Sequence, residues 1–168
     1  MNAPDRQAHE AAVADLLRNV LSFKEASLVI FRRGALIEFK TDLLEEKVSS
    51  FEEDGHRSWQ IGAFTGHHCH LDLGAVQEVL FDAEPVSCQG GRLNYTVWFS
   101  GAEDCGNPYR PTAMFSVTLN GPYETDGTPK REIIGQVYET YDVLRASPLV
   151  RGSEAFFQAR KGLQIRNG

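Results

Sequence analysis

The spacing of apolar and polar residues changes along this chain, and the changes predict the order of its elements. Between residues 5 and 22 the apolar positions follow helical spacing and form one stripe, which predicts an amphipathic helix. Residues 93–99 and 113–119 alternate apolar and polar side chains, which is the pattern of half-buried strands. Helical spacing returns at residues 133–144, and Pro148 closes this second helix.

Shorter apolar runs between the two helices predict further strands. Residues 28–31 and 35–40 flank a turn and are expected to pair as a hairpin, and residues 58–64 and 76–81 also have strand character. The acidic segment 41–56 is expected to form a loop that contains a helical turn. Because turns rather than helices join the strands, the pattern predicts an α+β fold, with antiparallel β-sheets flanked by N-terminal and C-terminal helices.

Length and end signals predict one domain with a short appendage. A chain of 168 residues is long enough to bury a full core without disulfides. Thr128 followed by Pro129 is expected to begin the second helix, as N-cap and first helical residue. We therefore expect a domain over residues 1–148 and a C-terminal extension over residues 149–168.

Composition narrows the classes of function. The net charge of −6 argues against a nucleic-acid-binding surface, and the sequence contains no membrane-spanning run or secretory signal. The three cysteines show no disulfide or metal-knuckle spacing, which favours reduced thiols in the cytoplasm. No phosphate-binding glycine motif or nucleophile motif is present, so the sequence favours a binding protein over an enzyme.

The segment from Gly66 to Leu73 contains three of the five histidines and is the strongest candidate for chemistry. If it forms a regular strand, His68 and His70 point to one face, and His67 and Cys69 to the other. The segment therefore cannot act as one four-ligand cluster.

Two kinds of cofactor suit this segment. A single non-haem metal ion bound by His68 and His70, in an enzyme or a metal-binding module, needs further ligands, for which Asp72 and His56 are the candidates. Haem needs one axial imidazole, an apolar wall and cations for its propionates. The candidate wall residues are Trp59, Phe64, Trp98, Phe99 and Phe115, and the candidate cations are Arg32, Arg33, Arg57 and Arg92.

A series of short segments, taken together, points to a known family. They are Leu36-Ile37-Glu38-Phe39, Ile61-Gly62, Thr65-Gly66-His67, His70-Leu71-Asp72, Val79-Leu80-Phe81, residues 95–99, residues 113–121 and Arg131-Glu132-Ile133-Ile134. In this order, over residues 28–144, they resemble the haem-utilisation family of the HemS/ChuX type. Around the histidines the family's Gly-His matches Gly66-His67 in one register, and its His-x-His-Leu matches residues 68–71 in another.

The resemblance implies a cytoplasmic haem-binding protein that handles haem inside the cell as a carrier or store. It implies His67, His68 or His70 as the axial ligand and, because the chain has room for one unit, a homodimer. The sequence departs from the family at Phe31, where short members can carry a histidine, and in its longer loop at residues 100–111. Because phenylalanine cannot bind iron, a cofactor-free interaction module on the same fold is a third hypothesis.

Overall fold

The computed structural model describes residues 3–33, 35–44, 48–53, 56–63, 65–85 and 92–165 of the chain. In chain order, the elements are α1 (Ala3–Leu21), β1 (Ala26–Arg32), β2 (Ala35–Lys40), the 3₁₀ turn η1 (Thr41–Leu43), β3 (Ser49–Glu53), β4 (His56–Gly62), β5 (His68–Leu71), the 3₁₀ turn η2 (Leu73–Ala75), β6 (Glu78–Pro85), β7 (Leu93–Ser100), β8 (Ala113–Leu119), α2 (Arg131–Leu144), β9 (Val150–Gly152) and α3 (Glu154–Ile165). The α+β class predicted from the sequence is confirmed.

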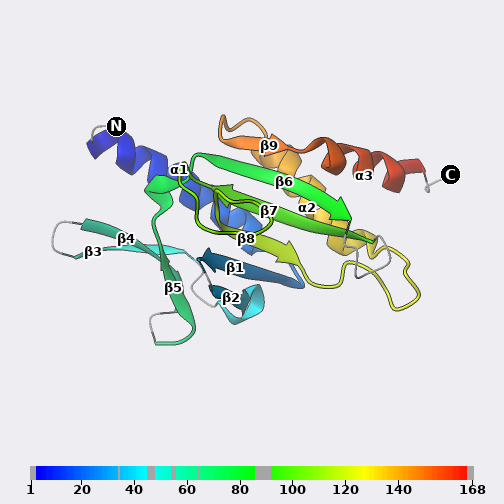
Figure 1. Ribbon diagram of the computed structural model, residues 1–168, viewed down its shortest axis with the longest axis horizontal. Helices are drawn as coiled ribbons and strands as arrows, with labels where there is room; N and C mark the ends of the chain where they lie inside the picture. The colour runs from blue at the N-terminus through cyan, green and yellow to red at the C-terminus, as the bar shows by residue number, and fades with distance from the viewer. Residues whose placement is uncertain are drawn as a thin grey trace.

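Six strands form the main sheet, in the order β2-β1-β8-β7-β6-β9 (Figure 1). The expected hairpin is present, since β1 pairs antiparallel with β2 and Phe31 faces Leu36 across the pair. The sheet is mixed rather than purely antiparallel, because the short strand β9 runs parallel to β6. Parallel pairs need a crossover connection, and here α2 provides it between β8 and β9.

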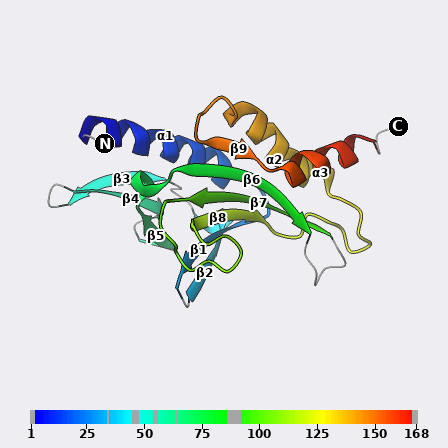
Figure 2. The ribbon, with the colours of Figure 1, turned by 45° about the horizontal axis from the view of Figure 1, so that its top comes forward.

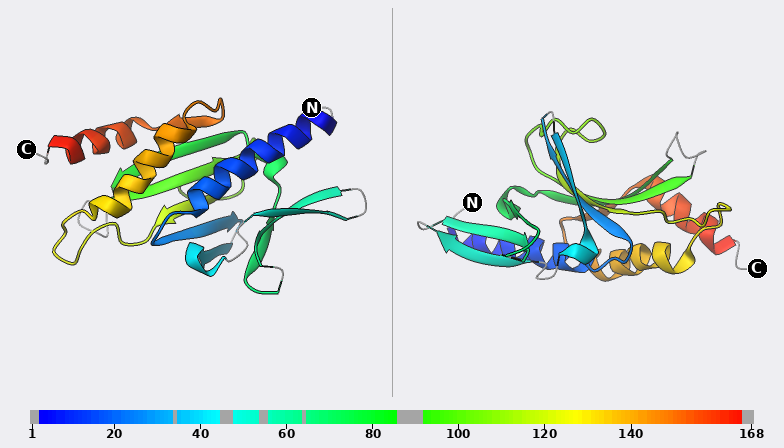
Figure 3. Two further views of the ribbon diagram at one scale, coloured as in Figure 1. Left: turned by 180° about the vertical axis from the view of Figure 1, so that it is seen from behind. Right: turned by 90° about the horizontal axis from the view of Figure 1, so that it is seen from below.

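The three helices lie on one face of this sheet and leave the other face open (Figures 2 and 3). Val13 and Leu17 of α1, Ile134 of α2 and Phe156 of α3 are fully buried, and they join one core with the inward side chains of the strands. Alternation along a strand places every second side chain on the opposite, open face. We use the term open face for this side of the main sheet throughout.

Residues after position 148 pack onto the same sheet and core. Val150 is registered beside Val79 of β6, and the Phe156 ring stacks on Tyr138 of α2 with ring centroids 4.5 Å apart. The Tyr138 hydroxyl donates a hydrogen bond to the Phe156 carbonyl oxygen. The domain boundary placed at residue 148 stays a prediction, and the C-terminal extension contains the helix α3.

A second sheet of three strands, β3-β4-β5, stands beside α1 (Figure 1). Within residues 41–56 the expected helical turn is present as η1, but the loop expected after it is wrong, because β3 occupies Ser49–Glu53 and pairs antiparallel with β4. Its polar sequence, Ser-Ser-Phe-Glu-Glu, resembles a loop, because most of its side chains remain exposed in the strand. Trp59 of β4 turns toward α1, and its indole Nε1 donates a hydrogen bond to Glu10 over 3.2 Å.

The start of α2 also differs from expectation. The helix begins at Arg131 with Lys130 as its N-cap residue, and Thr128 and Pro129 precede it. Pro129 instead forms a bridge with Tyr123, while the Asp126 carboxylate accepts a hydrogen bond from the Thr128 amide. The Thr-Pro pair thus belongs to a turn that leads into the helix, because the backbone bridge between Pro129 and Tyr123 forms before the helix starts.

Candidate functional site

The histidine segment forms β5 and the turn before it. His68 and His70 are exposed on one side of the strand, and Cys69 and Leu71 turn toward the core on the other, as alternation predicts. Burial raises the pKa of the Cys69 thiol to about 11, which makes it a packing group rather than a thiolate ligand. His67 is exposed but lies in the bend before β5, so it does not share the Cys69 face as a strand residue.

A local hydrogen bond orients the imidazole of His68. Its Nδ1 lies 3.0 Å from the carbonyl oxygen of Gly66. A carbonyl oxygen can only accept, so in the neutral ring Nδ1 carries the proton and Nε2 carries the lone pair. Metal-binding histidines are commonly held in this way, with one nitrogen hydrogen-bonded and the other bound to the metal.

His70 lies between His68 and an aromatic ring. The His68 and His70 ring centroids are 5.6 Å apart, and the Phe51 ring from β3 meets His70 edge-on at 5.3 Å. Gly62 of β4 is registered opposite His68 and has a φ of +94°, a conformation that favours glycine. The outer face of the small sheet therefore carries two imidazoles beside one apolar ring.

Asp72 does not complete a metal site with these histidines. Its carboxylate accepts a hydrogen bond from the Gly74 amide over 3.0 Å and lies 3.3 Å from the Arg6 guanidinium. It therefore begins the turn η2 and ties that turn to α1. The side chain of His56 lies outside the described residues. Among the described residues no group of three or more histidine, cysteine, aspartate or glutamate side chains is placed to hold one metal ion.

The candidate cations do not gather on the histidine face. Arg57 lies on the inward side of β4 with Trp59, and its guanidinium pairs with Glu52 over 3.2 Å. Arg32 and Arg33 lie at the turn that joins β1 to β2 in the main sheet. The Arg92 guanidinium lies over the Tyr123 ring, 5.8 Å from its centroid. The structure thus brings His68 and His70 together and leaves the four predicted arginines on other surfaces.

The candidate wall residues are also divided. Trp59, Phe99 and Phe115 lie in the main core, and Phe64 is outside the described residues. Trp98 projects instead onto the open face, where it packs in a separate cluster with Phe31, Leu80, Ala113 and Val29. The Phe31 and Trp98 ring centroids are 5.9 Å apart.

The open face contains a hollow of about 430 Å³. Phe31 and Trp98 line one part of it, and Tyr109 from the loop after β7 lines its edge. Alternate residues of β1, β2, β6, β7 and β8 provide the remaining walls. Because ligand sites are commonly concave and partly apolar with a few placed polar groups, this hollow is a second candidate site.

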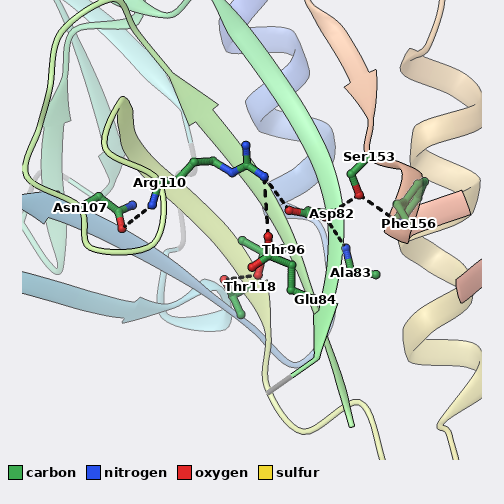
Figure 4. Close-up of polar contacts among 9 residues, drawn as sticks. All are labelled: Asp82, Ala83, Glu84, Thr96, Asn107, Arg110, Thr118, Ser153 and Phe156. Carbon is green, nitrogen blue, oxygen red and sulfur yellow. Dashed lines mark hydrogen bonds and ion pairs between the residues drawn. The ribbon is translucent and has the colours of Figure 1, made fainter. Parts of the chain in front are cut away.

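An acidic network borders this hollow. Asp82 of β6 is almost fully buried and accepts hydrogen bonds from the Arg110 guanidinium over 2.8 Å and from the Ser153 hydroxyl (Figure 4). Burial raises the pKa of the Asp82 carboxyl, but the bonds from Ser153 and Arg110 outweigh it and leave the pKa below its ordinary value. Burial and the neighbouring Asp82 raise the pKa of Glu84.

Sequence reasoning did not identify this network, because its members come from strands and loops far apart in the chain. One signal was present. Asp82 directly follows the apolar run Val79-Leu80-Phe81, at the end of a segment with strand character. A charged residue at such a position is almost never fully buried unless it is paired.

Comparisons with known proteins support the fold. No family model matches the chain, and no curated protein matches its sequence. Among solved structures, a crystal structure of ChuX matches with a TM-score of 0.55 at 10% identity, covering 82% of this chain and 75% of that one. The chain has a ChuX-like fold. The structure described as the haem-binding protein ChuX matches with a TM-score of 0.53 at 11% identity, over 78% of this chain and 71% of that one.

A protein from Erwinia carotovora has the same ChuX-like fold, with a TM-score of 0.53 at 15% identity, covering 80% of this chain and 73% of that one. The resemblance to the HemS/ChuX type that the sequence suggested is thus confirmed at the level of fold. In addition, no helix among the described residues is long and apolar enough to cross a membrane.

Proposed function

We propose that this chain is a haem-binding protein that handles haem inside the cell, as a carrier or store rather than an enzyme. The observation that carries the proposal is the orientation of His68, whose Nδ1 is hydrogen-bonded to Gly66 and whose Nε2 holds the lone pair. The ChuX-like fold supports it, because a structure with this fold is described as a haem-binding protein. We assign His68 as the axial ligand, with His70 as the neighbouring imidazole.

The described residues fit one part of a haem site. The exposed face of β5 offers an imidazole, and Phe51 offers an apolar surface beside it. The predicted arginines Arg32, Arg33 and Arg57 lie elsewhere, so this face provides no cations for the propionates from among them. A haem site here therefore needs a second surface to cover the porphyrin.

We propose that a second copy of the chain provides this surface in a homodimer. The outer edge of β2 pairs with no strand in the described part of the chain, and Ile37 on this strand is 51% exposed. An exposed apolar edge strand favours pairing with another chain. We expect the wild-type protein to sediment as a dimer and the Ile37→Lys variant to sediment as a monomer. A monomer at high concentration with and without haem would contradict the homodimer.

Haem titration followed by the Soret band tests the function directly. We expect saturable binding by the wild type, loss of most of the affinity in His68→Ala, and a smaller loss in His70→Ala. His67→Ala is the matched control, because His67 is also exposed but lies outside β5. Its affinity should match the wild type. An unchanged titration in a variant that lacks all three histidines would refute the assignment.

A non-haem metal ion is the alternative that one observation favours. With ring centroids 5.6 Å apart on the same face, His68 and His70 are close enough to bind one ion. Elemental analysis of the purified protein distinguishes the two functions. One equivalent of zinc, nickel or iron without porphyrin absorbance would support this alternative. A protein that binds neither haem nor metal would support the cofactor-free interaction module.

A further inference from the structure

The hollow on the open face carries more negative than positive charge. Glu38 of β2 and Asp82 and Glu84 of β6 line it, and the guanidinium of Arg110 contacts two of these three carboxylates, at 2.8 and 3.8 Å. Lys40 lies beyond Glu38 and lines a neighbouring hollow. No cation among the described residues forms an ion pair with Glu38. The hollow therefore disfavours an anionic ligand such as haem.

The protein already holds a cation at this place. The Arg110 guanidinium lies over the ring of Trp98, 5.8 Å from its centroid, while it pairs with Asp82. An aromatic face beside carboxylates is the arrangement that binds organic cations through both ion pairing and cation–π attraction. A ligand cation beside Glu84 would find the same chemistry, because the single Arg110 guanidinium faces two carboxylates there and cannot neutralise both.

Two buried polar groups of the hollow lack partners. Among the described residues, Trp98 Nε1 and Ser116 Oγ have no hydrogen-bond partner, although both side chains are more than nine-tenths buried and both residues line the hollow. Buried polar groups are nearly always paired in folded proteins, so unpaired ones at a hollow point to a missing ligand or water. Phe31 and Tyr109 supply apolar surface beside them.

We propose that the open-face hollow binds a small organic amine with an apolar ring or chain. Its ammonium group pairs with Glu84, and its apolar part packs on Phe31, Trp98 and Tyr109. This site lies on the main sheet and uses none of the histidines of β5. It is therefore independent of the proposed haem function, and either can fail without the other.

A matched set of probes tests the charge preference. 2-Phenylethylamine, 2-phenylethanol and phenylacetate share an aromatic ring and differ in charge at pH 7. Isothermal titration calorimetry of the full chain should show saturable binding of the amine, binding at least about fivefold weaker for the alcohol, and none for the acid. Equal binding of the amine and the acid, or no saturable binding of the amine, would overturn the proposal.

Substitutions on the surface locate the amine without endangering the fold. Glu84→Gln should weaken 2-phenylethylamine binding by about fivefold or more, and Glu38→Gln by less, because β1, β8 and β7 separate Glu38 from Glu84 in the sheet. Glu139→Gln makes the same change of charge on an exposed residue of α2, on the other side of the sheet, and should leave binding unchanged. If Glu139→Gln weakens binding as much as Glu84→Gln does, the attraction is general to the net charge, and the site assignment is wrong.

The apolar part of the site has its own pair of variants. Tyr109, which lines the hollow, is 75% exposed, and Val143 on α2 is 72% exposed. Tyr109→Ala should weaken 2-phenylethylamine binding by about threefold or more, because apolar contact area is lost. Val143→Ala should have no effect. Unchanged binding in Tyr109→Ala would contradict contact between the amine and this edge of the hollow.

Discussion

Asp82 holds together three parts of the fold, and replacing it with asparagine should be costly. Its side chain is 3% exposed, and it accepts bonds from Arg110 of the loop after β7 and from Ser153 at the start of α3. Ser153 in turn accepts a hydrogen bond from the Phe156 amide. The Asp82 carboxylate therefore fixes both a loop at the open face and the helix that carries the tail of the chain.

The size of the effect follows from what asparagine keeps and loses. In Asp82→Asn the remaining oxygen can still accept from Ser153, but the new amide group turns donors toward the donors of Arg110. One charge-assisted hydrogen bond is lost, which contributes about 1.5–3 kcal/mol. Because Arg110 is 31% exposed and can be rehydrated, we place the loss near the middle of this range, at about 2 kcal/mol.

Urea unfolding followed by circular dichroism measures this loss. Asp142→Asn is the matched control, because Asp142 pairs with Arg160 on the surface of the helices and should contribute about 1 kcal/mol or less. A loss of about 2 kcal/mol in Asp82→Asn should also lower the melting temperature by about 4–8 °C. If Asp82→Asn loses no more stability than Asp142→Asn, the Asp82 network does not hold the loop and α3 in place.

Three further predictions follow from single residues. Because folding lowers the pKa of Asp82, its carboxylate stabilises the fold above the unfolded pKa of about 3.9, and this contribution is lost as the pH falls further. The difference in unfolding free energy between wild type and Asp82→Asn should therefore shrink between pH 6 and pH 3. A difference that stays constant over this range would contradict the prediction. Gly62→Ala should destabilise the fold by about 2 kcal/mol or more, since Gly62 has a φ of +94° and the new Cβ would clash with the His67 carbonyl oxygen. Gly135→Ala in α2 meets no atom within 4 Å and should stabilise the fold by about 0.5–1 kcal/mol. Shifts of the same sign in the two unfolding curves would refute this. With a pKa of about 11, about one part in a thousand of the Cys69 thiol should be thiolate at pH 8. Cys69 should therefore react with iodoacetamide far more slowly than a free thiol, which peptide mapping by mass spectrometry can measure. Labelling at the rate of free cysteine would show that the thiol is not buried.

The pattern of apolar residues predicted those elements whose two sides differ. The helix over residues 3–21 and the strands β7 and β8 each turn apolar side chains to the core on one side and carry mostly polar side chains on the other, so their period is visible in the sequence. Strand β3 escaped prediction, because its polar composition resembles a loop and its pairing with β4 is what makes it a strand. The parallel pairing of β9 with β6 depends on contacts between distant segments that no local pattern records.

In the candidate sites, too, local patterns predicted some features and missed those that depend on distant contacts. Alternation correctly separated His68 and His70 from Cys69, because a strand imposes that geometry wherever it forms. The hydrogen bond from His68 to Gly66 could not be predicted, since it depends on the bend before β5. The open-face hollow was missed because its residues occupy the outward positions of five strands, and in a sequence such positions look like ordinary solvated surface.

The most direct test of the proposed function compares two absorption spectra. Wild-type protein and the His68→Ala variant are each mixed with one equivalent of haem under the same conditions, with circular dichroism confirming that both are folded. The expected result is a sharp, shifted Soret band for the wild type and a spectrum close to that of unbound haem for the variant. Identical spectra for the two proteins would contradict ligation by His68, and a wild-type spectrum equal to that of unbound haem would contradict haem binding itself.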